Sequence, residues 1–189
     1  MIRAMDVGVA LLVLLALAPL IGLIALAIRL ADGGPAIFCQ QRVGRNLTPF
    51  TIYKLRTMRP SGVQTTGAGL AAAHRTGCGD PRITAVGRVL RPLHLDELPQ
   101  LANVLAGQMS LVGVRPDTPM QAGDYPPGYW HERHLFAPGI TGPAQVAGSD
   151  LTLDQRSALE RQWLAGRSLA LYLRVLWQTI GKVFVRSSH

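Results

Sequence analysis

The most constraining feature of this chain is an uncharged apolar run that extends from Val7 to Ile28, between Asp6 and Arg29. As an α-helix the run would be about 33 Å long, which is enough to cross the hydrocarbon core of a bilayer. A secretory signal peptide is the first alternative, but the run is long for one, and no convincing small-x-small cleavage site follows it. The sequence therefore predicts a segment that is inserted in a membrane.

Pro19 lies in the middle of this run, where it removes a backbone hydrogen bond and predicts a kink in the helix. A sharp kink would let the segment enter and leave the membrane on the same face, although a spanning helix can also absorb a proline. We expect a re-entrant helix over residues 1–32, which leaves Met1 and residues 33–189 on the cytoplasmic side. A single span is the alternative, and it also keeps the basic chain after Arg29 in the cytoplasm.

The segment from Arg29 to Arg91 is strongly basic and contains only two acids, Asp32 and Asp80. The net charge of the chain is +8, and all but two of its 19 basic residues are arginine, whose planar guanidinium binds phosphate through two hydrogen bonds. Such a chain attracts nucleic acid, an anionic membrane face or phosphorylated small molecules. Nucleic acid is disfavoured, because neither an aromatic-studded basic strand nor a recognition-helix pattern is present.

Residues 33–189 predict one domain that is α+β and mainly helical. Two short β-prone runs at residues 36–40 and 50–56 flank a turn with Gly, Asn and Pro, which predicts a β-hairpin. Residues 60–79 are rich in Gly, Ala, Ser and Thr without apolar periodicity, so we expect a mobile loop there.

In the rest of this domain, loops separate helical patterns. One helix is expected from Asp80 to Leu90, and Pro/Gly-rich loops are expected at residues 113–129 and 138–143. The tail from Thr152 to Val185 predicts an amphipathic helix, with Trp177 among its apolar residues and basic residues between them. Such a helix suits a membrane interface, and a core-packing helix is an equal alternative.

Asp96 and Glu97 form an acidic pair at the proline-marked start of a predicted helix that extends from about Glu97 to Ala106. The structural interpretation is that Asp96 caps this helix and Glu97 is favoured by its positive end. The functional interpretation uses the same geometry, because free N–H groups at a helix N-terminus attract a phosphate. A carboxylate there can attack phosphorus or hold the divalent cation that neutralises the phosphate. The spacing alone leaves both interpretations open.

Neither the cysteines nor the histidines predict a metal site. Cys39 and Cys78 are far apart and predict free thiols in a reducing compartment rather than a disulfide. His131 and His134 lie three residues apart beside Glu132, and without a further pair of ligands they predict a polar helix surface.

Several motifs follow one another along nearly the whole chain. They are Pro19 within the apolar segment, Gln41-Arg-Val-Gly, Tyr53-Lys-Leu-Arg-Thr-Met, Asp80-Pro-Arg-Ile-Thr, Gly87-Arg, Leu95-Asp-Glu-Leu-Pro-Gln-Leu, Asn103-Val-Leu-Ala-Gly-Gln-Met-Ser-Leu-Val-Gly-Val-Arg-Pro and Pro138-Gly-Ile-Thr-Gly-Pro-Ala-Gln-Val. In this order they resemble the bacterial sugar transferases, which are monotopic polyprenyl-phosphate phosphoglycosyl transferases. The resemblance implies one catalytic domain with interfacial helices at the inner (cytoplasmic) membrane of a bacterium.

The resemblance implies a ping-pong reaction. Asp96 would attack the β-phosphate of a UDP-sugar and release UMP, and a polyprenyl phosphate would then take the phosphosugar from Asp96. This transfer would be the first membrane step in the assembly of a glycan such as an exopolysaccharide, an O-antigen or a glycoprotein. Glu97 would assist as a metal partner or as a proton-transfer group, and Mg²⁺ held by Asp96 and Glu97 is the expected cation.

The resemblance also implies which residues bind the substrates. Thr141 and Gln145, in and after the Gly-Ile-Thr-Gly turn, would line the nucleotide or sugar site. Four basic residues at motif positions would clamp phosphates, as arginine does well: Lys54, Arg56, Arg91 and Arg115.

Three positions depart from the family pattern. Ala147 and Ser149 stand where Asn and Arg are common, which removes an expected phosphate contact, and His94 stands where Ser or Thr is common. One alternative to an active enzyme is a family member that has lost activity through the changes at residues 147 and 149. The chief alternative from another class is a membrane-anchored, non-catalytic module whose basic region binds anionic lipid or nucleic acid. Metal-dependent turnover distinguishes the enzyme from both.

Overall fold

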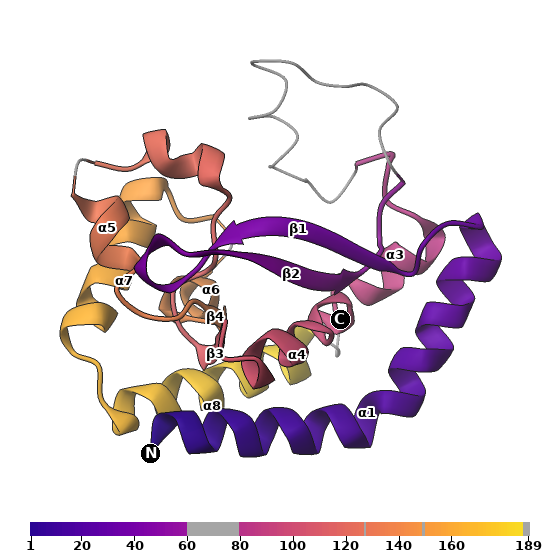
Figure 1. The fold of residues 1–189 in the computed structure, drawn as a ribbon, viewed down its shortest axis with the longest axis horizontal. Coiled ribbons are helices and arrows are strands. Elements are labelled where there is room, and N and C mark those ends of the chain that lie inside the picture. Colours follow the sequence, from indigo (N-terminus) through magenta and orange to yellow (C-terminus); the bar gives the residue numbers. More distant parts are fainter. Residues whose placement is uncertain (60–79, 127, 149, 187–189) are drawn as a thin grey trace.

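The structure is a computed structural model that describes residues 1–59, 80–126, 128–148 and 150–186. The predicted loop at residues 60–79 lies outside this described part, and so do Cys78 and Ser149. Figure 1 shows a hairpin and a set of short helices gathered against one long N-terminal helix. The predicted α+β, mainly helical fold is confirmed.

The apolar run forms helix α1 (Ile2–Asp32), with Pro19 inside it. Figure 1 shows that α1 bends partway along its length, in agreement with the predicted kink. The helix ends at Gly33, whose φ of 69° is a left-handed conformation that glycine adopts without steric cost. Within the described residues, α1 is the one helix that is long and apolar enough to cross a membrane.

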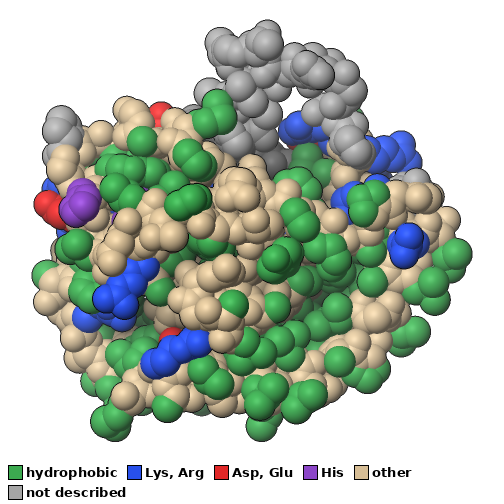
Figure 2. All heavy atoms as spheres, in the orientation of Figure 1, with side chains coloured by type: hydrophobic (Ala, Val, Ile, Leu, Met, Phe, Trp, Pro, Cys, Tyr) green, Lys and Arg blue, Asp and Glu red, His purple; other side chains and the backbone are tan. Residues whose placement is uncertain are grey.

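Much of the apolar surface of α1 is exposed, although Ala10 and Ile28 are buried against the rest of the protein. Figure 2 shows hydrophobic side chains gathered along the lower and right margins of the molecule, where α1 lies. An apolar surface of this extent is typical of a membrane-inserted segment. Its largest exposed side chains are Leu11, Leu12, Leu15, Leu20, Leu23, Leu26 and Leu30.

The predicted hairpin is confirmed. Its elements are β1 (Ile37–Val43), the 3₁₀ turn η1 (Arg45–Leu47) and β2 (Pro49–Leu55), and the two strands are antiparallel. Successive side chains of a strand point to opposite faces, so Phe50, Ile52 and Lys54 share one face of β2. Phe50 and Ile52 are buried in the core, whereas Lys54 lies beyond it. Phe38 of β1 is the register partner of Lys54 and lies on the same face.

Three short helical elements follow the segment that is not described: α3 (Ala85–Leu90), η2 (Leu95–Glu97) and α4 (Gln100–Leu105). The prediction that the first helix begins at Asp80 is wrong, because Thr84 caps it. The Thr84 hydroxyl accepts a hydrogen bond from the Gly87 N–H at 2.9 Å, which starts the helix at the next residue.

The predicted start of the next helix is also wrong. Asp96 and Glu97 lie in the three-residue turn η2, and α4 begins only after Pro99. Pro99 has no N–H to donate to the preceding turn, so a regular helix cannot continue back through it. Asp96 therefore does not cap α4, and the cleft described below does not use an α-helix N-terminus at this acid.

The C-terminal half consists of β3 (Ser110–Val112), η3 (Pro119–Asp124), α5 (Tyr129–Arg133), β4 (Gly139–Thr141), α6 (Pro143–Ala147), α7 (Leu153–Ala165) and α8 (Leu169–Arg186). Strands β3 and β4 are parallel neighbours. The predicted loop at residues 113–129 is irregular only in part, since it contains η3. The predicted single tail helix is wrong: Gly166 ends α7, and the Ser168 hydroxyl accepts from the Leu171 N–H at 3.2 Å and starts α8.

The core lies where α1, α4, β2, β3 and α8 meet. Helix α8 supplies Tyr172 and Val175 to this core and exposes Leu173, Trp177 and Ile180, with Trp177 at 76%. The two interpretations of the tail are therefore compatible, because one face of α8 packs in the core and the other is an exposed apolar face with a tryptophan. Figure 1 shows α8 running close to the N-terminal half of α1, and the Tyr172 hydroxyl donates to Asp6 of that helix.

Candidate active site

A cleft with a volume of about 680 Å³ opens beside the β-hairpin and the η2 turn. Apolar side chains of Ile37, Phe38 and Leu55 form part of its lining. The fold gathers six of the predicted site residues here from separate parts of the sequence: Lys54, Arg56, Arg91, Asp96, Glu97 and Arg115.

Lys54 and Glu97 meet because β2 carries the lysine beyond the core and η2 packs beside β2. The Lys54 Nζ donates to Glu97 Oε1 at 2.7 Å, and Arg115 Nη2 lies 3.6 Å from the same oxygen. Burial by itself would raise the pKa of Glu97, but the charges of Arg115 and Lys54 lower it to about 2. Glu97 is therefore an ionised carboxylate that two cations hold in place.

Asp96 has a different electrostatic environment from its neighbour. Burial, and then the negative charge of Glu97, raise the pKa of Asp96 against the opposing effects of Lys54 and Arg91. The pKa values of the two adjacent acids are thus shifted in opposite directions, which is typical of carboxylates with separate roles. Glu97 is paired with its cations, whereas Asp96 is the acid whose charge is less compensated.

Sequence reasoning missed three arginines that also line the cleft, namely Arg42, Arg59 and Arg82, whereas His94, singled out above as a departure from the family pattern, lines it too. Arg42 Nη2 donates to Gln40 Oε1 at 2.6 Å, and burial followed by the charge of Arg115 lowers the pKa of Arg42 to about 10. Arg42 and Arg82 belong to motifs on which the resemblance rests, but a motif does not say toward which cavity an arginine points. A cleft with this excess of cations attracts a polyanion such as a diphosphate.

Over residues 1–186 the sequence matches the family model described as bacterial sugar transferase. The chain belongs to this family. The match includes α1 as well as the domain that holds the cleft, so the predicted resemblance is confirmed over nearly the whole chain.

Three relatives illustrate what this bacterial sugar transferase is similar to. An undecaprenyl-phosphate glucose phosphotransferase of Komagataeibacter xylinus is 42% identical over 201 residues, which cover 98% of this chain and 36% of the relative. The exopolysaccharide production protein PSS of Rhizobium leguminosarum bv. phaseoli is 37% identical, with 94% of this chain and 92% of the relative covered. A UDP-glucose:undecaprenyl-phosphate glucose-1-phosphate transferase of Caulobacter vibrioides is 42% identical, with 94% and 67% covered. The chain thus spans about a third of the first relative and most of the second.

In this bacterial sugar transferase, two residues predicted to bind the donor are not among those that line the cleft. Thr141 Oγ1 is 2.8 Å from Thr179 Oγ1 of α8, and Gln145 sits on α6, which packs against α7 and α8. The Gln145 carbonyl accepts from Lys182 Nζ at 3.5 Å. The structure does not bring Thr141 and Gln145 into the cleft that contains Asp96. A role for them in binding the donor stays a prediction.

The residues of the cleft fit the expected Mg²⁺ by their chemistry. Mg²⁺ is commonly bound by one or two carboxylates together with substrate phosphates and water. Asp96 and Glu97 supply two adjacent carboxylates, and Glu97 Oε1 is the oxygen that Lys54 already contacts. Among the described residues no group of three or more His, Cys, Asp and Glu side chains has the placement of a metal site, so a cation here would need ligands from the substrate.

Among the described residues, the cysteine and histidine side chains considered from the sequence form no metal site. Cys39 is an exposed free thiol that lines the cleft. His131 is exposed on α5, as predicted. The prediction of a polar surface is wrong for His134, which is buried with its ring 4.3 Å from that of Trp130 and its Nδ1 2.6 Å from the Trp130 carbonyl oxygen. Tertiary packing of α5 against η3 and α7 buries one face of a helix too short to show a periodic pattern.

Proposed function

We propose that this protein transfers a phosphosugar from a UDP-sugar to a polyprenyl phosphate, through a covalent intermediate on Asp96, as the first membrane step of glycan assembly. One observation carries the proposal: a single cleft joins the acidic pair to seven arginine and lysine residues, five more than are needed to neutralise the two acids. A cleft of this charge balance suits a substrate that brings phosphate groups with it. Relatives whose names include UDP-glucose and undecaprenyl phosphate support the choice of donor and acceptor.

The proposed first step is an attack of an Asp96 carboxylate oxygen on the phosphorus that carries the sugar. The new carboxyl–phosphate bond forms as the bond from that phosphorus to the bridging oxygen breaks, and the oxygen leaves with UMP. In the second step an oxygen of polyprenyl phosphate attacks the same phosphorus, and the bond to Asp96 breaks. The products are polyprenyl-diphospho-sugar and the regenerated carboxylate.

The chain's own residues supply the electrostatic part of this reaction. Lys54 and Arg115 hold Glu97 ionised beside the nucleophile and present positive charge to the phosphates. The positive charge of Arg91, which lines the same cleft, lowers the pKa of Asp96 and so favours its carboxylate form. Mg²⁺, when bound by Asp96 and Glu97, would neutralise phosphate charge and orient the diphosphate.

The membrane arrangement we propose is a re-entrant α1 at the cytoplasmic face of a bacterial inner membrane. Its N-terminal end is fixed to the domain: Arg3 donates to the carbonyls of Val104 and Leu105 at 2.6 and 3.0 Å. Asp6 is buried and accepts from the Leu111 N–H at 2.9 Å. The other end packs Ile28 against the domain in a second apolar cluster. A helix with both ends on one domain supports entry and exit at the same face.

The experiment that tests the reaction is incubation of the purified protein with Mg²⁺ and a panel of UDP-sugars. Without acceptor, we expect release of at most one equivalent of UMP with the accepted sugar, and with polyprenyl phosphate we expect continuous release. Salt-sensitive binding of anionic lipid without UMP release for any sugar would instead favour the non-catalytic module.

Labelling tests the membrane arrangement. Ala4 is exposed near the start of α1, so Ala4→Cys in a background with Cys39→Ser and Cys78→Ser places one thiol there. In intact cells a membrane-impermeant maleimide should leave this thiol unmodified until the cells are opened. Efficient modification from outside would establish a span and contradict the re-entrant arrangement.

A further inference from the structure

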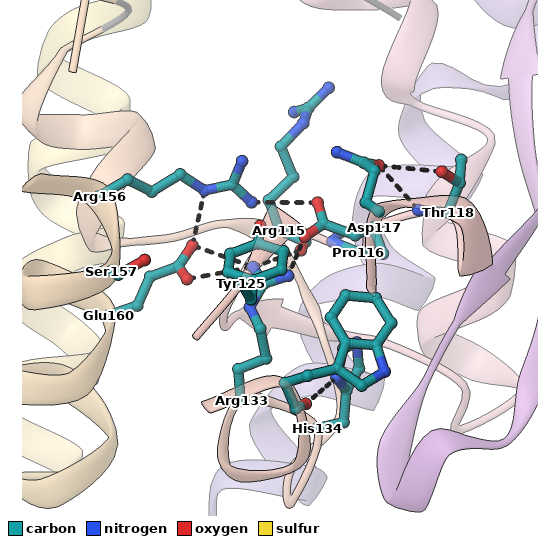
Figure 3. Close-up of polar contacts among 12 residues, drawn as sticks. Arg115, Pro116, Asp117, Thr118, Tyr125, Arg133, His134, Arg156, Ser157 and Glu160 are labelled. Atoms are coloured by element: carbon teal, nitrogen blue, oxygen red, sulfur yellow. Dashed lines mark hydrogen bonds and ion pairs between the residues drawn. The ribbon is translucent and has the colours of Figure 1, made fainter. Parts of the chain in front are cut away.

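A second cluster of charges lies outside the cleft, between α5, α7 and the loop that follows β3. Figure 3 shows Arg133 and Arg156 facing Asp117 and Glu160. Arg133 pairs with Asp117 and, at 3.1 Å, with Glu160, and Arg156 reaches the same two acids at 3.1 and 2.9 Å. Tyr125 and Tyr129 donate their hydroxyls to Asp117 and Glu160. We call the four charged residues, Asp117, Arg133, Arg156 and Glu160, the buried quartet.

The buried quartet is electrically balanced, with two arginines and two acids. Arg133, Asp117 and Glu160 are each at most 2% exposed, so no substrate reaches them directly. Arg156 is the more exposed member, with 21% of its side chain accessible. Burial of ion pairs gives little net stability relative to apolar side chains of similar volume, because desolvation offsets the attraction between the charges. A contribution to geometry accounts for the quartet better than a contribution to stability.

The quartet is connected to the loop that carries Arg115. Arg133 Nη2 donates to the Arg115 carbonyl at 3.3 Å. The next two carbonyls are also used: Pro116 accepts from Arg42 Nη1 at 3.0 Å, and Asp117 accepts from the Val43 N–H at 2.9 Å. Three consecutive peptide carbonyls are therefore fixed, two of them by the hairpin and one by the quartet.

This backbone holds Arg115 so that its side chain points away from the quartet, as Figure 3 shows, and into the cleft. There its Nη2 lies 3.6 Å from Glu97 Oε1. A continuous series of polar contacts thus extends from α7 through Arg133 and Arg115 to the acidic pair. Arg115 is only partly buried, so its backbone rather than close packing of its side chain sets its direction.

We propose that Arg133, held by Asp117 and Glu160, is a positioning residue for the phosphoglycosyl transfer, which acts by aiming Arg115 at Glu97 and at the donor phosphates. This inference rests on the proposed function for its activity readout. Misplacement of a catalytic group by about 1 Å can cost roughly 10²-fold in rate, so loss of the positioning contact should be visible without loss of the fold.

The test is a double-mutant cycle between Arg133 and Arg115. Arg133→Lys keeps the positive charge beside Asp117 but lacks the fork that contacts Glu160 and the Arg115 carbonyl together. We expect it to slow UMP release by about 10- to 100-fold. In an Arg115→Met background, the same substitution should cost less than about threefold, because the group that it aims is already absent.

Trp163→Phe is the matched control, because Trp163 is 3% exposed on the same helix as Glu160 and is not a partner in the ion pairs of the quartet. It should lower stability and change UMP release by a similar factor whether residue 115 is Arg or Met. If Arg133→Lys likewise slows UMP release by the same factor in both backgrounds, its effect is independent of Arg115, and the positioning role is overturned.

A second readout needs no turnover. For the same four proteins, calorimetry measures the affinity for inorganic pyrophosphate. Hydrogen exchange is measured at the Val43 amide, which donates to the Asp117 carbonyl in the structure. Arg133→Lys should weaken pyrophosphate binding only when Arg115 is present and should speed exchange at Val43. Equal weakening in both backgrounds, or unchanged exchange, overturns the inference, whereas absence of UMP release from the wild type contradicts the proposed function alone.

Discussion

The cluster of charged side chains around Asp117 and the cluster around Asp96 contain the same residue types, but they differ in the ratio of positive to negative charges. In the buried quartet each acid meets two arginines and one tyrosine hydroxyl, and the positive and negative charges are equal in number. In the cleft, two acids lie among a larger number of cations, and the site is open to solvent. A balanced, closed cluster needs no further partner, whereas an unbalanced, open one lacks the negative charge that a ligand can bring.

The pKa shifts follow the same division. In the quartet the two arginines lower the pKa of Asp117 despite its burial. In the cleft only Glu97 is stabilised in this way, while the pKa of Asp96 is raised. The negative charge of Asp96, the proposed nucleophile, is thus less stabilised than that of Glu97. The surplus cations line the space where phosphates would bind.

The largest expected effect is that of Asp96→Asn. UMP release should fall by more than about 10³-fold, because the amide is not a nucleophile toward phosphorus. The fold should survive, since Asp96 does not cap a helix and removing its charge relieves repulsion with Glu97. Mass spectrometry should find a phosphosugar on the peptide that contains Asp96 in the wild type and none in the variant. Asp124→Asn, at an exposed acid, is the control.

If Asp96→Asn retains substantial turnover after deamidation to Asp is excluded, nucleophilic catalysis is refuted. A direct transfer from donor to acceptor would then explain the reaction, and the contrast between the two clusters would lose its chemical meaning.

Removal of the cation closest to Glu97 should have the next largest effect. Lys54→Met leaves Glu97 with Arg115, which is more distant at 3.6 Å. UMP release should fall by roughly 10²-fold, as for the loss of one preorganised electrostatic contact. Arg45→Met removes an exposed positive charge from the hairpin turn and should have little effect. Equal losses in the two variants would mean that overall charge, not the placement of Lys54, supports the reaction.

Breaking one pair of the buried quartet should lower the stability of the fold in addition to its effect on rate. Glu160→Gln leaves the buried Arg133 and the partly exposed Arg156 with one acid, so we expect a loss of about 3–5 kcal/mol in the free energy of unfolding. Urea unfolding in detergent measures it. Asp80→Asn, which breaks the local pair with Arg82, should cause a much smaller loss. If the two losses are alike, burial of the quartet has no special weight.

The smallest expected effect is on the acid limb of the stability profile. Because the folded-state pKa of Asp117 is depressed, its contribution is fully present above the unfolded value of about 3.9 and is lost as pH falls through the folded value. Asp117→Asn should therefore flatten the decline of the unfolding free energy in acid. Asp154→Asn, at an exposed acid of α7, should keep the wild-type slope. An unchanged slope in Asp117→Asn would show that other groups set the acid limb.

Local chemistry was sufficient to predict several elements. The membrane-like helix with Pro19 and the hairpin follow from apolar length and turn residues, whereas the six residues of the cleft follow from the resemblance to the family. Helix boundaries at Thr84, Pro99 and Ser168 were missed, although each has a local cause in a capping hydroxyl or a missing N–H. For α3 and the tail, apolar periodicity did not reveal the capping hydroxyl, and for α4 the cap had been assigned to Asp96, before the proline at which the helix starts.

The buried quartet was not predictable from the sequence. It joins Asp117 of a loop to Arg133 of α5 and Arg156 of α7, which are 16 and 39 residues away along the chain. A lone arginine or acid on a short helix is read as a solvated residue unless its partner across the fold is known. The same holds for Arg42, whose place in the cleft depends on which face of β1 turns toward η2.

By itself the sequence determined that the chain has an apolar segment, a basic region and an acidic pair of the bacterial sugar transferase type, since these depend on residue identity and short-range spacing. Only the tertiary structure decided that Glu97 is held by Lys54 and Arg115, that Asp96 is the less compensated acid and that both ends of α1 contact one domain. The physical reason is range: periodicity and capping act over a few residues, whereas burial and charge pairing depend on groups that are distant in sequence and adjacent in space.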